Sequence, residues 1–194
     1  MRMPFIHRGT GEVVFKLVYC GVGMGGKTTN IVQLHRMLKG RSRELVTLDN
    51  ADDRTVFFDF LPLTIVDGWP FRLRFNLYSV PGQHHYQATR RVLLRGADGI
   101  VFVVDSQVQR LPENLQSFRQ TLSMLVDSGW HVGHDPLVVQ YNKRDCPKPV
   151  ELGVVESRFG LGGCPRFEAT ASEGLGVVET IRAVAHRVVE RFEP

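Results

Sequence analysis

A glycine-rich segment carries the clearest chemical pattern in this chain of 194 residues. Residues 21–28 read Gly-Val-Gly-Met-Gly-Gly-Lys-Thr and match G-x-x-x-x-G-K-[ST]. Because glycines have no side chain, successive backbone N–H groups can surround phosphate oxygens, and the helix that follows adds partial positive charge. Lys27 is expected to reach the β- and γ-phosphates, and the Thr28 hydroxyl is expected to ligate Mg²⁺. The predicted nucleotide-binding residues of this phosphate loop are Gly21, Gly23, Gly25, Gly26, Lys27, Thr28 and Thr29.

A second motif, Asn142-Lys143-Arg144-Asp145, bears on the choice of base. The Asp145 carboxylate can accept hydrogen bonds from guanine N1–H and the 2-amino group, a pair of donors that adenine lacks. Lys143 can lay its methylene stem along the base, and Asn142 can link this guanine loop to the phosphate loop. The pattern is short and also occurs as a polar loop at a strand end. Its place about 115 residues after Lys27 favours guanine recognition.

Composition excludes several other classes of protein. Hydrophobic residues make up 43% and charged residues 23% of the chain, as in ordinary globular proteins. The net charge of +4 is spread along the sequence, so we expect no nucleic-acid interface. The three cysteines are far apart and lack metal-ligand spacing, which predicts neither a disulfide framework nor a structural zinc site. No apolar run approaches the roughly 20 residues of a membrane helix. With no signal peptide and no acceptor for a lipid, the sequence predicts a cytoplasmic protein without a lipid anchor.

Strand and helix patterns alternate along the chain, which is typical of a mostly parallel α/β sheet. In residues 72–80, apolar side chains alternate with polar ones, and Asp67-Gly68 separates this run from residues 55–63. The two runs therefore predict an antiparallel hairpin. The expected strands are Val13–Cys20, Thr55–Leu63, Arg72–Val80, Ile100–Asp105, Leu137–Tyr141 and Arg166–Ala169, and the expected helices are 27–39, 113–128 and 177–192.

With these motifs in place, the chain resembles the Ras-like small GTPases over nearly its whole length. Arg54-Thr55 stands where switch I has its Mg²⁺-ligating threonine. Pro81-Gly82-Gln83 stands where the γ-phosphate-sensing glycine and the water-orienting glutamine are found. Glu168-Ala169-Thr170-Ala171 looks like the last nucleotide loop, in which the Ala171 N–H would meet guanine O6. The resemblance implies one domain over residues 1–194 with a three-layer P-loop GTPase fold. Its sheet would have six strands, mostly parallel with one antiparallel edge strand, and helices on both faces.

The closer similarity is to the MglA-type bacterial small GTPases. It rests on the stretch Asp53-Arg54-Thr55-Val56-Phe57-Phe58-Asp59-Phe60-Leu61-Pro62, on Val80-Pro81-Gly82-Gln83 and on Gln140-Tyr141-Asn142-Lys143-Arg144-Asp145. The similarity implies a switch that cycles between GDP and GTP forms and controls motility and polarity. It also implies a Roadblock-domain GTPase-activating partner of the MglB kind, an exchange factor and effectors, a monomer when alone, and recruitment to the cell pole through partners.

The resemblance assigns roles to single residues. Gln83, Arg54 and Lys27 become the catalytic candidates, with Arg54 as an intrinsic arginine finger. Thr28 and Thr55 become the Mg²⁺ ligands. The further nucleotide-binding candidates are Thr55, Gly82, Asn142, Lys143, Asp145, Thr170 and Ala171.

The sequence also departs from the Ras-like pattern. Ser79 occupies the position of the aspartate that most Ras-like proteins use for Mg²⁺, and MglA-type proteins have a threonine there. Asp53 and Asp59 are the candidates to compensate. Ser172 replaces a lysine that often stacks on guanine. His84-His85 is a poor metal pair because adjacent side chains point to different sides, and a role of this pair in contacting a partner stays open.

Two other functions stay open at this point. Ser79 is compatible with a scaffold that binds GTP or GDP without turnover. A P-loop kinase acting on a small acceptor shares the phosphate loop, but the sequence shows no arginine-rich lid, and the guanine motif is unexpected in that class.

Overall fold

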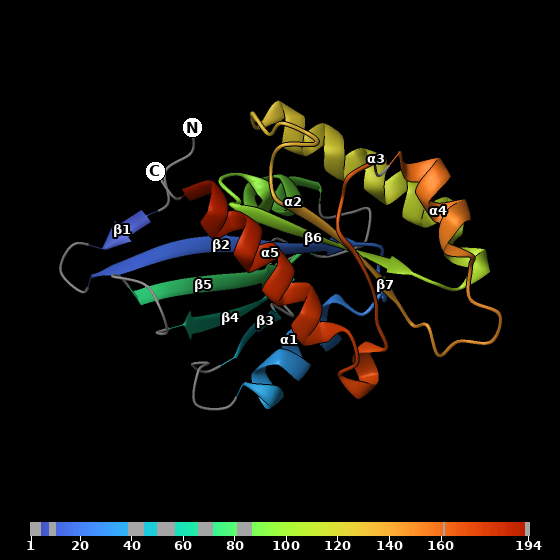
Figure 1. The fold of residues 1–194 in the computed structure, drawn as a ribbon, viewed down its shortest axis with the longest axis horizontal. Helices are drawn as coiled ribbons and strands as arrows, with labels where there is room; N and C mark the ends of the chain where they lie inside the picture. Colours follow the sequence, from blue (N-terminus) through green and yellow to red (C-terminus); the bar gives the residue numbers. More distant parts are fainter. Residues whose placement is uncertain are drawn as a thin grey trace.

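A central sheet with helices on both faces organises the chain (Figure 1). The computed structural model describes residues 5–7, 11–38, 45–49, 57–65, 72–80, 87–160 and 162–192. Within these residues the sheet has eight strands, in the order β3-β4-β5-β2-β6-β7-β8, with β1 paired to β2 outside this order. The strands are β1 (Phe5–His7), β2 (Glu12–Gly21), β3 (Val46–Asp49), β4 (Phe57–Ile65), β5 (Arg72–Ser79), β6 (Gly99–Asp105), β7 (Leu137–Asn142) and β8 (Arg166–Glu168).

Five α-helices and two short 3₁₀ helices are described. They are α1 (Lys27–Met37), α2 (Gln87–Leu94), η2 (Val108–Arg110), α3 (Leu111–Asp127), α4 (Leu152–Phe159), η3 (Ala171–Glu173) and α5 (Val177–Phe192). None of the described helices is both long and apolar enough to cross a membrane.

The strand directions confirm the predicted α/β class. Strands β5, β2, β6, β7 and β8 run parallel to one another, and β4 is antiparallel to β5 as the hairpin pattern predicts. All six expected strands are present, and the structure adds β1 and β3, which have three and four residues and are too short to show an alternating pattern. Because β3 pairs with the outer side of β4, the antiparallel β4 is not the edge strand that the sequence analysis expects.

The core lies in two layers, one on each face of the sheet. Helices α1 and α5 pack on one face, and α2, α3 and α4 pack on the other (Figure 1). Every residue of β6 is buried because this central strand is covered on both sides. Val101 and Val103 contribute to the first layer, and Ile100, Phe102 and Val104 contribute to the second.

The hairpin has the predicted alternation. Leu73, Phe75 and Leu77 are buried, whereas Arg72 is exposed. The hairpin tip, residues 66–71, lies outside the described residues. Strands β2, β6 and β7 run parallel, so their carboxyl ends meet at one edge of the sheet. That edge is where open α/β sheets bind ligands.

Candidate functional site

The phosphate loop leaves β2 at Gly21 and enters α1 after Gly26. At both positions a side chain would clash with neighbouring atoms, so only glycine fits. Gly21 has φ 133° and Gly26 has φ 98°, values that side-chain-bearing residues rarely adopt. A Cβ on Gly21 would lie 2.2 Å from the Val103 carbonyl oxygen, and a Cβ on Gly26 would lie 2.1 Å from Asn142 Nδ2. The loop is therefore pressed against β6 on one side and against the end of β7 on the other.

Lys27 lies across this loop. Its ammonium donates hydrogen bonds to the Gly21 carbonyl at 3.2 Å and to the Val22 carbonyl at 2.6 Å, and the residue is buried. The first turn of α1 carries no acidic side chain, so the positive potential of the helix N-terminus is not compensated there. Thr28 is exposed at this N-terminus, and Thr29 is half-buried. A buried cation and an uncompensated helix N-terminus make the loop suited to a multiply charged anion.

The guanine loop begins at the end of β7 and is joined directly to the phosphate loop. Asn142 is buried, and its Nδ2 donates to the Gly25 carbonyl at 2.8 Å. This is the link between the two loops that the sequence analysis expects. Asn142 Oδ1 accepts a hydrogen bond from the Ala171 N–H at 2.9 Å. One amide side chain therefore holds three segments together: the phosphate loop, the guanine loop and the segment 168–171.

The Ala171 contact differs from the one that the resemblance implies. The N–H assigned to guanine O6 donates to Asn142 Oδ1 in the structure, and Ala171 is buried. A contact with guanine O6 would have to share or replace this hydrogen bond. The Asp145 side chain, in contrast, is exposed beside the loop, where a base could reach its carboxylate.

The segment after β8 is held by Arg144, the variable position of the guanine motif. Its Nε donates to Glu168 Oε2 at 2.7 Å, and its backbone N–H donates to the Ala169 carbonyl at 3.1 Å. Gly176 is also fixed by space, since a Cβ there would lie 2.1 Å from the Glu168 carbonyl oxygen. Arg144 therefore positions the last nucleotide loop, a role that the sequence analysis did not assign to it.

A buried polar chain lies behind the loops. Gln140 is fully buried in β7, and its Nε2 donates to Asn30 Oδ1 at 2.8 Å and to Thr180 Oγ1 at 3.0 Å. Asn30 Nδ2 in turn donates to the Gly26 carbonyl at 2.9 Å. The chain links α5 through β7 to the first residues of α1. The sequence signal for it was a glutamine within an otherwise apolar strand.

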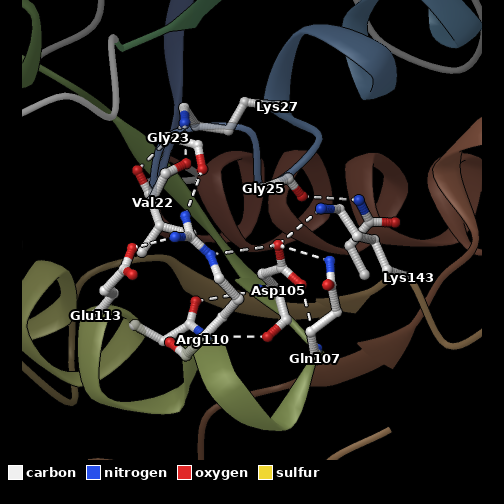
Figure 2. A network of polar contacts seen from close by, with 12 residues as sticks. Val22, Gly23, Gly25, Lys27, Asp105, Gln107, Arg110, Glu113 and Lys143 are labelled. Carbon is white, nitrogen blue, oxygen red and sulfur yellow. Dashed lines mark hydrogen bonds and ion pairs between the residues drawn. The ribbon is translucent and has the colours of Figure 1, made fainter. Parts of the chain in front are cut away.

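A second network, centred on Asp105, connects the two loops by a different route (Figure 2). Asp105 ends β6 and is only 1% exposed. Its Oδ2 accepts a hydrogen bond from Lys143 Nζ at 2.7 Å and lies 3.8 Å from Arg110 Nε. Arg110 Nη2 donates to the Gly23 carbonyl at 2.8 Å, and Arg110 Nη1 pairs with Glu113. Asp105 and Arg110 belong to none of the motifs found in the sequence, although a carboxylate directly after a buried strand is a usable signal.

Comparison with known proteins agrees with this geometry. The model of the ADP-ribosylation factor (Arf) family matches residues 8–168. The mutual gliding-motility protein MglA of Myxococcus xanthus (strain DK1622) is 39% identical over 192 residues, which cover 98% of each chain. The chain is an MglA-type small GTPase. The Ras-related protein RABG3c of Arabidopsis thaliana is 26% identical over 92% of this chain and 84% of its own. Human ADP-ribosylation factor-like protein 4C is 26% identical over 75% of this chain and 68% of its own.

Membership of this family confirms the predicted function class. The protein binds guanine nucleotides and hydrolyses GTP, and it has the Ras-like fold. Neither alternative from the sequence analysis, the scaffold without turnover or the small-molecule kinase, is favoured by these similarities.

Several predicted residues of the GTPase belong to segments outside the described part of the chain. Arg54, Thr55, Gly82 and Gln83 lie outside the described residues, as do Asp53 and the pair His84-His85. Of the candidates to replace the missing Mg²⁺ carboxylate, only Asp59 falls in a described strand, where its backbone pairs with Thr47. Ser79 is buried at the end of β5 beside Tyr19 of β2. Among the described residues, no group of three or more His, Cys, Asp or Glu side chains could hold a metal ion.

The thiol behind the phosphate loop carries no charge. Cys20 is fully buried next to the last residue of β2, and this burial raises the pKa of its thiol to about 12, although Lys27 and Arg90 act in the opposite direction. The thiol therefore stays protonated at neutral pH, and it places no negative charge beneath a loop that must hold an anion.

Proposed function

We propose that this GTPase is a GTP-operated switch for bacterial gliding motility and cell polarity. The observation that carries the proposal is the junction at Asn142, which fixes the phosphate loop and the guanine loop relative to one another. The likeness to a mutual gliding-motility protein extends over 98% of both chains and supports the cellular role. A cycle between GDP and GTP forms would order Thr55 and Gly82 on the γ-phosphate and release both after hydrolysis.

The residues of the phosphate loop fit a nucleoside polyphosphate. Gly21 and Gly26 leave no room for a side chain, and the uncompensated N-terminus of α1 favours negative charge. Lys27 would exchange its contacts with the loop carbonyls for contacts with β- and γ-phosphate oxygens. Thr28 and Thr55 would hold Mg²⁺, which neutralises charge on the β- and γ-phosphate oxygens.

The base would be selected by the exposed Asp145 carboxylate. Its two oxygens can accept the N1–H and 2-amino hydrogen bonds of guanine, and no comparable pair of donors exists on adenine. The stem of Lys143 can cover one face of the base while its ammonium stays on Asp105. Thr170 and Ala171 would line the other side of the nucleotide.

Hydrolysis would depend on segments beyond the described residues. Gln83 would orient the attacking water, and Arg54 would supply positive charge to the transition state. Such an arginine is worth about 10³–10⁵ in rate in this class of enzyme. A Roadblock-domain activator of the MglB kind would bring Arg54 into place, and an exchange factor would reload the protein with GTP. The protein itself would be a cytoplasmic monomer without a nucleic-acid partner, and effectors would recruit it to the cell pole.

GTP turnover with and without a Roadblock-domain activator tests this proposal. The wild-type protein should turn over slowly alone and much faster with the activator. Arg54→Ala and Gln83→Leu should keep GDP affinity and lose most of the stimulation. GTP hydrolysis that stays negligible both without and with the activator would contradict the switch and favour the scaffold.

A further inference from the structure

We infer that Arg110 is a positioning residue that sets the direction of the Gly23–Met24 peptide in the phosphate loop, and that Asp105 couples this setting to Lys143 in the guanine loop (Figure 2). The inference rests on the proposed function in one respect: residues 21–28 must bind the phosphates of GTP.

The direction of the peptide follows from its planarity. In a trans peptide the carbonyl and the next N–H point in opposite directions, and no cis peptide occurs in the described chain. Arg110 Nη2 holds the Gly23 carbonyl at 2.8 Å, on the side of the loop that faces η2 and α3. The N–H of Met24 is therefore turned away from Arg110. It becomes a donor for a phosphate oxygen, whereas a flipped peptide would present the carbonyl oxygen and repel the phosphate.

The backbone at Met24 supports this assignment. Met24 has φ 60°, in the left-handed region that is unfavourable for residues with a Cβ. Such a conformation persists where the surroundings determine it from several sides. The Gly25 N–H donates to the Val22 carbonyl at 3.2 Å, and Arg110 holds the intervening peptide. The Met24 side chain is 90% exposed, so its own packing does not hold the conformation.

Arg110 is well suited to hold this peptide because its guanidinium is itself fixed. Nε faces Asp105, Nη1 pairs with Glu113, and Nη2 bonds to Gly23. The backbone around it is fixed as well, since the Arg110 carbonyl accepts a hydrogen bond from the buried Asn114 Nδ2 at 2.9 Å. A lysine cannot reproduce three directed contacts from one planar group.

Asp105 links Arg110 to the guanine loop. Its Oδ2 receives Lys143 Nζ at 2.7 Å and lies 3.8 Å from Arg110 Nε. Its Oδ1 accepts the Gln107 N–H at 3.1 Å, which prevents the carboxylate from turning freely. The cation of the guanine loop and the cation at the phosphate loop therefore share one buried carboxylate. A donor aimed at a phosphate oxygen matters most when negative charge grows on that oxygen, so loss of aim should lower kcat more than nucleotide affinity.

The test compares Arg110→Gln and Arg110→Lys with Arg119→Gln, a matched loss of charge at an exposed position of α3. Single-turnover GTP hydrolysis, equilibrium binding of fluorescent GDP, and the ³¹P NMR spectrum of bound nucleotide are measured for each. We expect Arg110→Gln to slow hydrolysis by about 10–100-fold, to change GDP affinity by less than about 3-fold, and to shift the phosphate resonances. Arg110→Lys should recover part of the rate, and Arg119→Gln should match the wild type.

The other outcomes of this test would contradict the inference about Arg110 or the proposed function. Wild-type hydrolysis and wild-type ³¹P resonances in Arg110→Gln would show that the peptide needs no such support. If Arg110→Gln and Arg110→Lys each lost hydrolysis rate and GDP affinity to the same extent, with lowered thermal stability, Arg110 would have only a structural role. Failure of the wild-type protein to bind GTP would overturn the proposed function as well. This outcome can be told apart from failure of the inference about Arg110, because the defect would be present before any substitution.

The coupling through Asp105 has its own test. Asp105→Asn keeps the shape of the side chain and removes its charge, and should weaken GDP binding while also slowing hydrolysis. In the double variant Arg110→Gln/Asp105→Asn, the loss of rate should be clearly smaller than the product of the two single losses. Independent, multiplying losses would show that the carboxylate serves the two loops separately.

Discussion

Gly26 and Asn142 are in direct contact: a Cβ on Gly26 would lie 2.1 Å from Asn142 Nδ2. The two residues belong to different motifs, 116 positions apart in the sequence. The phosphate loop can therefore occupy its place only because Gly26 has no side chain. For the same reason, Asn142 of the guanine loop keeps its position only while residue 26 is a glycine.

The substitution Gly26→Ala should displace Asn142 and strain a backbone with φ 98°. We expect GDP binding to weaken by about 100-fold or more, which corresponds to about 2.7 kcal/mol. Gly153→Ala is the matched control, since the space around Gly153 in α4 is open. Isothermal titration of both variants checks the prediction, and wild-type affinity in Gly26→Ala would contradict the packing.

The substitution Gln140→Leu should lower stability. It leaves Asn30 Oδ1 and Thr180 Oγ1 without their buried donor, and each lost partner in a buried site costs about 1–3 kcal/mol. Urea unfolding should therefore show a lower midpoint with an unchanged slope. Gln116→Leu, at an exposed position of α3, should stay within about 0.5 kcal/mol of the wild type. Equal stability of the two variants would contradict the role of the buried chain.

The substitution Asp145→Asn should remove guanine selectivity. The wild-type protein should bind GDP more tightly than IDP, because hypoxanthine lacks the 2-amino donor. In the variant, GDP affinity should fall on the order of 10²-fold or more, and the preference for GDP over IDP should disappear. Competition binding with both nucleotides measures this. A preserved preference would mean that another group reads the 2-amino edge.

The thiol of Cys20 should resist alkylation in the folded protein. Its pKa is raised to about 12 by burial, and the thiolate is the reactive form. Iodoacetamide at pH 8 should therefore leave Cys20 unmodified until urea unfolds the chain. Raising the pH to 10 should leave it protected as well, because that pH is still below the raised value. Peptide mass spectrometry distinguishes the three cysteines, and rapid native modification of Cys20 would contradict its burial.

Much of the architecture could be predicted because it rests on local patterns. The strand before Gly21, the alternating run Leu73, Phe75 and Leu77, and the apolar strand at residues 100–105 each carry a periodic signal, and their parallel arrangement follows from the helices between them. Strands β1 and β3 could not be predicted. They are three and four residues long, and each forms only through pairing with a neighbour that the sequence does not identify.

The site was predicted where its residues belong to compact motifs. The phosphate loop and the sequence Asn142-Lys143-Arg144-Asp145 were visible for that reason. Asp105 and Arg110 act across the fold on Lys143 and Gly23, 38 and 87 positions away in the sequence. No spacing rule connects such residues, and only the converging ends of β2, β6 and β7 bring them together.

Equilibrium binding of fluorescent GDP, GTP and ATP, with and without Mg²⁺, is the direct test of whether the two joined loops form a guanine-nucleotide site. We predict tight binding of GDP and GTP, strengthened by Mg²⁺, with ATP bound far more weakly, and loss of binding of all three nucleotides in Lys27→Ala. Preference for ATP, or guanine binding that Lys27→Ala leaves unchanged, would contradict this prediction.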